Sequence, residues 1–69
     1  MNKYEIIVYW SDADDAYIAE VPELPGCMAD GHTYVEAIKN ADTIISEWIE
    51  TATLMAREIP KPKGKLYYA

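Results

Sequence analysis

The first third of the chain alternates between apolar and polar positions. Residues 4–10 are rich in β-branched and aromatic side chains, and every second residue falls on the same side. Residues 16–21 alternate again until Pro22, which withholds the next donor of a strand ladder. The short polar side chains of residues 11–15 are typical of a turn. The pattern therefore predicts a hairpin of two antiparallel strands.

A proline-rich segment follows the hairpin. Two prolines fix φ and withhold donors, while a glycine permits positive φ, so residues 22–26 predict a rigid turn rather than regular structure. The residues that we assign to this structural turn are Pro22, Pro25, Gly26 and Cys27. Residues 27–30 are short and weakly patterned, and we interpret them as a third strand.

A long amphipathic helix is predicted next. Thr33 and Glu36 have the spacing of a capping box, so we expect the helix to begin at Tyr34. Apolar residues then recur at steps of three and four residues. The two prolines in residues 59–62 are expected to end the helix, and residues 65–69 are a candidate fourth strand.

This order of elements predicts a two-layer α+β domain, β-β-β-α-β, with one helix packed on a mostly antiparallel sheet. The second face of the sheet is then uncovered, and the chain has more large aromatic side chains than one helix covers. A chain of 69 residues also has a folding free energy near zero without a disulfide, a metal or a partner. We therefore expect a homo-oligomer, either a dimer or a tetramer.

The amino-acid composition excludes several kinds of disulfide, metal and catalytic site. Cys27 is the only cysteine and His32 the only histidine, which excludes an internal disulfide and a cysteine-histidine zinc cluster. No third group that would orient a Cys-His pair is evident, so we expect Cys27 to be buried and structural. We expect no metal, no cofactor and no enzymatic activity. With no leader segment and no long apolar run, the chain is predicted to be cytoplasmic and not membrane-bound.

Charge points to a basic partner. The net charge is −6, and residues 1–56 hold two lysines against eleven acids, a net −9, whereas residues 57–69 are net +3. Such a field repels a nucleic acid duplex and attracts a basic protein. The acids of the first turn lack the glycine of a calcium loop, which argues against a calcium site. Because they carry negative charge, we predict that they steer a basic partner. The predicted partner-binding residues are Asp12, Asp14 and Asp15, with Tyr9 and Tyr17 as aromatic anchors.

Three segments together resemble the HicB antitoxin family. They are Val21-Pro22-Glu23-Leu24-Pro25-Gly26-Cys27, Gly31-His32-Thr33-Tyr34-Val35-Glu36-Ala37 and Ile59-Pro60. The resemblance implies a partial ribonuclease-H-like fold without ribonuclease activity. It also implies a domain that binds and masks a small basic mRNA-cleaving toxin of double-stranded-RNA-binding fold. In that family a separate C-terminal DNA-binding domain represses the operon.

This chain departs from the family pattern in three ways. It stops at Ala69, so we expect a single HicB-like domain over residues 1–69, with no C-terminal DNA-binding domain and no direct DNA binding. His32 stands where an aspartate is usual, and Ala16 where a glycine is common. Two functions therefore stay open: an antitoxin-like module that sequesters a basic RNase, or a stand-alone oligomeric regulatory or ligand-binding protein of the same fold with no toxin partner.

Overall fold

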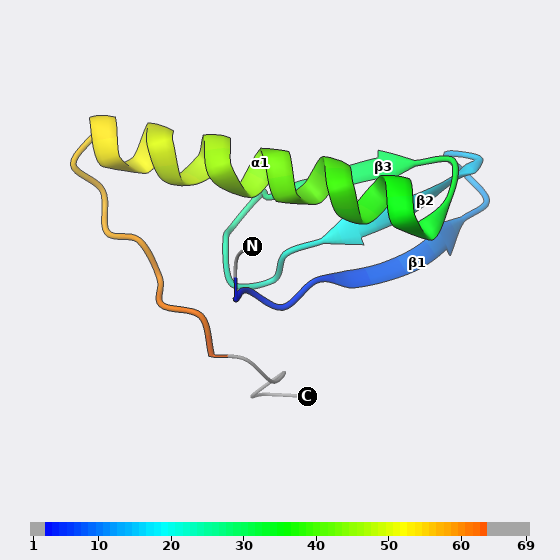
Figure 1. Cartoon of the computed structure of the whole chain (residues 1–69), viewed down its shortest axis with the longest axis horizontal. Helices are drawn as coiled ribbons and strands as arrows, with labels where there is room; N and C mark the ends of the chain where they lie inside the picture. The colour runs from blue at the N-terminus through cyan, green and yellow to red at the C-terminus, as the bar shows by residue number, and fades with distance from the viewer. Residues whose placement is uncertain (1–2, 64–69) are drawn as a thin grey trace.

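The computed structural model describes residues 3–63, which form three strands followed by one helix (Figure 1). The elements are β1 (Ile7–Ser11), β2 (Ala16–Glu20), β3 (Met28–Gly31) and α1 (Tyr34–Leu54). The strands form one antiparallel sheet in the order β1-β2-β3, and α1 lies along one of its faces. The predicted α+β arrangement of three strands and a helix is confirmed. The predicted fourth strand, residues 65–69, lies outside the described residues, and the ribonuclease-H-like likeness stays a prediction.

Strand register decides which side chains face the helix. Ala19 pairs with Val8 on one side and with Ala29 on the other. Ala19 is fully buried against Ala37 and Ala41 of α1. Small residues on both surfaces allow the helix and the sheet to approach closely. The side chains one position away along each strand point to the other face of the sheet, which α1 leaves uncovered.

The helix is longer than the sheet that it covers. Its 21 residues span roughly 32 Å, about twice the length of a five-residue strand. Figure 1 shows the second half of α1 extending past the strands. There Ile45 packs on Val21, Leu24 and Cys27, so the proline-rich loop extends the core beyond the sheet.

The helix ends at Leu54, several residues before the prolines that were predicted to end it. The Arg57 N–H donates to the Ala52 carbonyl at 2.8 Å, and the Ala56 N–H donates to the Thr53 carbonyl at 3.1 Å. Ala56 has a φ of 56°, so these bonds form a Schellman motif with alanine at the left-handed position. The expectation that residues 59–62 end the helix was wrong, because this local motif ends it at Leu54.

One carboxylate joins the beginning and the end of the described chain. Glu23 accepts the backbone N–H of Glu5 at 3.2 Å and the backbone N–H of Lys63 at 2.7 Å. The Tyr4 hydroxyl donates to the Pro60 carbonyl beside it. Burial, together with the charge of Glu23, raises the pKa of Tyr4. We call this arrangement the Glu23 bridge; the residues before Ile7 are fixed by it rather than by the strand pairing that residues 4–10 predicted.

Candidate functional site

The acidic turn between β1 and β2 is built from hydrogen bonds of its own side chains. The Trp10 indole N–H donates to Asp12 at 2.6 Å, and the Ser11 hydroxyl donates to Asp14 at 2.8 Å. The Asp15 N–H donates to the Asp12 carbonyl at 3.3 Å, and Asp15 has a φ of 51°. Aspartate tolerates this left-handed backbone better than most residues with a Cβ. The three carboxylates are therefore exposed together at one end of the sheet.

Tyr9 lies on the face of the sheet that α1 does not cover. Tyr9 is 40% exposed, and its hydroxyl donates to the Glu20 carboxylate at 3.0 Å. That hydrogen bond, then partial burial and the nearby charges of Glu20 and Asp14, raise the pKa of Tyr9. Asp14 also lines a hollow together with Ile18, the residue that pairs with Tyr9, so the acidic turn lies near Tyr9.

Tyr17 lies on the opposite face, beside the start of the helix. Its ring centroid is 4.3 Å from that of Tyr34 and 5.1 Å from that of Trp10, with the Trp10 ring nearly perpendicular. These contacts hold Tyr17 in a half-buried aromatic cluster. The structure therefore brings Tyr9 together with the acidic turn but places Tyr17 on the other side of the sheet.

Four further residues surround Tyr9, and three of them, Ile18, Met28 and Asp30, were not among the partner-binding residues predicted from the sequence. Tyr9 pairs with Ile18, Ile18 pairs with Asp30, and Glu20 pairs with Met28 in the next row. The same alternation that predicted the strands places these side chains on one face, but their grouping depends on the register. We call this surface the open face; it consists of Ile7, Tyr9, Ile18, Glu20, Met28 and Asp30, with Asp14 at its rim.

The proline-rich loop forms a hydrogen-bonded turn that is attached to α1. The Cys27 N–H donates to the Leu24 carbonyl at 2.9 Å, and Gly26 has a φ of 78°. Proline followed by a glycine at positive φ is the arrangement of a type II turn. The Trp48 indole N–H donates to the Pro25 carbonyl at 3.0 Å, which ties the loop to α1. Cys27 is buried, and burial raises the pKa of its thiol, so it is a poor nucleophile.

The side chains of Thr33 and Glu36 cap the N-terminus of α1. Thr33 accepts the Glu36 backbone N–H at 3.1 Å, and Glu36 in turn accepts the His32 backbone N–H at 3.1 Å. The return bond of the capping box thus goes to the residue before the cap. His32 and Cys27 belong to different local structures, and His32 is exposed.

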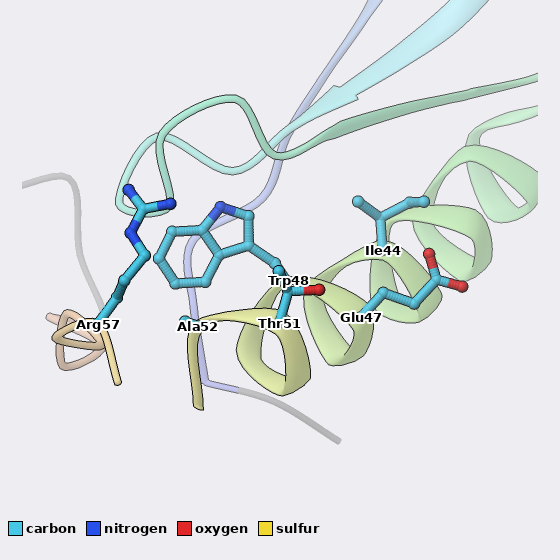
Figure 2. Close-up of a pocket in the computed structure, with 6 residues that line it drawn as sticks. All are labelled: Ile44, Glu47, Trp48, Thr51, Ala52 and Arg57. Carbon is cyan, nitrogen blue, oxygen red and sulfur yellow. The ribbon is translucent and has the colours of Figure 1, made fainter. Parts of the chain in front are cut away.

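A shallow hollow of about 280 Å³ lies near the end of α1 (Figure 2). Figure 2 shows the Arg57 side chain extending beside the Trp48 indole, with Glu47 further along the helix. The hollow offers one guanidinium and one carboxylate. No group of three or more His, Cys, Asp or Glu side chains within residues 3–63 is arranged to hold a metal ion.

Known proteins with similar sequences identify the family. A sequence profile of the HicB-like antitoxins of bacterial toxin-antitoxin systems matches residues 4–66. A UPF0150 protein of Thermoplasma acidophilum is 37% identical over 63 residues, which cover 91% of this chain and 90% of the relative. A UPF0150 protein of Synechocystis sp. is 30% identical over the same length, covering 91% and 85%. An uncharacterized 14.9 kDa protein of Haemophilus phage HP1 is 42% identical over 48 residues, 70% of this chain and 36% of the relative. The chain belongs to the HicB-like antitoxin family of bacterial toxin-antitoxin systems.

Proposed function

We propose that this protein is a cytoplasmic antitoxin that binds and masks a small basic mRNA-cleaving toxin and has no catalytic activity of its own. Membership of the HicB-like antitoxin family supports a toxin partner in general. Among residues 3–63, no helix is long and apolar enough to cross a membrane. The buried thiol of Cys27 and the exposed His32 offer no nucleophile-base pair for an alternative enzymatic role.

The observation that carries the proposal is the one-signed charge of the strand half of the molecule. Residues 4–38 contain eight Asp and Glu residues and no Lys or Arg. Three of these acids form the exposed turn between β1 and β2. A basic protein is attracted to such a surface before contact, which raises the association rate.

The test is a titration against the purified product of a short basic reading frame adjacent to this gene. We expect changing Asp12, Asp14 and Asp15 together to asparagine to slow association by about tenfold at low salt and to flatten the salt dependence. Asparagine keeps an acceptor oxygen for Trp10 and Ser11 and tolerates the backbone of Asp15.

The matched control removes three exposed carboxylates from the rest of the chain, as Glu47→Gln, Glu50→Gln and Glu58→Gln. Net charge changes equally in both triple variants, so a larger effect in the turn locates the steering charges. Equal effects would contradict steering by the turn. Failure of the unaltered protein to bind the basic product would contradict the antitoxin proposal.

One observation supports self-association, which the second function, a stand-alone oligomer, requires. Four large apolar side chains are exposed close to the β1 side of α1, namely Trp10, Tyr34, Val35 and Ile38. α1 packs mainly on β3 and β2 and least on β1, which leaves these side chains uncovered. Surface of this kind supports self-association with or without a toxin.

A further inference from the structure

The open face of the sheet has the composition of a protein interface. Met28 is 49% exposed and Tyr9 is 40% exposed, and Ile7 beside them is half-buried. Tyrosine and methionine are enriched where proteins meet. Within residues 3–63, α1 covers the other face of the sheet and no helix covers this one. The apolar side chains are therefore available to a partner.

Carboxylates surround these apolar side chains. Glu20 lies in the row between Ile7 and Met28, and Asp30 lies in the row that contains Tyr9. Asp14 lies at the edge of this face, where it lines a hollow together with Ile18 and Asp30. Because residues 4–38 include no Lys or Arg, no basic side chain of the three strands balances these acids. The face is therefore both apolar and uniformly acidic.

A hollow of about 290 Å³ opens on this face. It is lined by Asp14, Ile18, Met28, Ala29 and Asp30. Ile18 at the floor of this shallow hollow is 8% exposed, whereas Met28, Asp14 and Asp30 around it are exposed. Since a water occupies about 30 Å³ in the liquid, the hollow is large enough for a whole side chain.

The lining fits a long cationic side chain. Lysine and arginine pack their aliphatic stems on apolar surface while the charged head stays among polar groups. Ile18 and Met28 supply such a surface, and Asp14 and Asp30 supply acceptors for the head group. An acidic or neutral side chain would leave these carboxylates without compensation.

We propose that the open face is the docking surface for a basic protein partner, and that a Lys or Arg side chain of this partner occupies the hollow over Ile18. This inference rests on the proposed function, and it assigns the contact surface that the function leaves open. A second copy of the chain is a poorer fit to the same face. Two copies packed face to face would bring two acidic surfaces together, and charges of the same sign in contact disfavour association.

The experiment compares two charge reversals of equal size. Asp30→Lys places a cation at the hollow, whereas Glu50→Lys places one on an exposed position of α1. Both raise the net charge by two, so the long-range attraction falls equally. Against the purified product of any basic reading frame adjacent to this gene, at 0.15 M salt, we expect Asp30→Lys to raise Kd by about tenfold or more. Glu50→Lys should raise it by less than about threefold, since separated surface charges are screened.

A second pair of variants tests the apolar contact without a change in charge. Met28→Ala removes an exposed side chain from the open face, and Leu54→Ala removes one from the far end of α1. We expect Met28→Ala to raise Kd and Leu54→Ala to leave it unchanged. All four positions are exposed, and a melting curve for each variant verifies that the fold is retained.

The possible outcomes test the proposed docking surface separately from the proposed antitoxin function. If the unaltered chain binds the basic product but Asp30→Lys and Met28→Ala bind it as well as their controls do, the docking surface is wrong and the antitoxin function stands. If Met28→Ala instead dissociates a homodimer of the unaltered chain, the face is a self-interface and the proposal is overturned. If the unaltered chain binds no basic product, both proposals fall.

Discussion

Gly31 and Gly26 are restricted to glycine for different physical reasons. A Cβ on Gly31 would lie 2.5 Å from the backbone nitrogen of Ala37 and 2.8 Å from the carbonyl carbon of Glu36. The end of β3 therefore touches the first turn of α1, backbone against backbone. A Cβ on Gly26 would meet no atom within 4 Å, so only its positive φ restricts that residue.

We predict that Gly31→Ala lowers the free energy of unfolding by about 3 kcal/mol, because neither backbone is free to move away from the added methyl group. Gly26→Ala should lower it by only about 1 to 2 kcal/mol, the cost of a left-handed backbone for a residue with a Cβ. Urea unfolding of both variants at one protein concentration checks the order. A Gly31→Ala variant as stable as the unaltered chain would show that β3 and α1 are further apart than described.

Among the elements, α1 departs most from its expected boundary. Its C-terminal Schellman motif places Ala56 at φ 56°, a position that glycine usually occupies. Alanine has a steric cost there that glycine avoids. The backbone is therefore slightly strained at Ala56, where the helix ends.

Ala56→Gly is expected to raise the free energy of unfolding by about 0.5 to 1 kcal/mol, since the strain relieved exceeds the added freedom of the unfolded chain. Ala13→Gly is the control: it makes the same change in an exposed turn residue without a positive φ and should be neutral or destabilising. Thermal melts of both variants measure the difference. A lower melting temperature for Ala56→Gly would contradict the role assigned to Ala56.

These boundaries show what the sequence was able to predict. Alternation in residues 4–10 and 16–21 located β1 and β2, and the Thr33-Glu36 spacing located the start of α1. The helix end escaped prediction because alanine gives no sign of a left-handed residue. The open face escaped as well, since its grouping depends on strand register, and register is a property of residues distant in sequence.

At the scale of the whole molecule, two different surfaces stay uncovered. The open face is acidic, whereas the exposed apolar side chains near the start of α1 carry no charge themselves. We propose that the first surface binds a basic partner and that the second binds a copy of the chain. We therefore expect the domain to bind a partner and to self-associate at the same time.

We expect light scattering at micromolar concentration to give a mass of at least twice 7.8 kDa. Val35→Glu should reduce that mass, because it places a charge among the exposed apolar side chains while suiting the first turn of a helix. Leu54→Glu adds the same charge at the other end of α1 and serves as the control. A monodisperse monomer of the unaltered chain would contradict self-association.

The Glu23 bridge closes residues 5–63 into a loop without a covalent bond between its ends. One carboxylate joins the backbone at Glu5 to the backbone at Lys63, which is the connection that a disulfide makes in many domains of this size. A disulfide acts largely by restricting the unfolded chain, whereas this bridge exists only in the folded state and leaves the unfolded chain unrestricted. Its stabilisation therefore depends on the Glu23 carboxylate and its two backbone donors, and it is indifferent to whether the surroundings are oxidising or reducing.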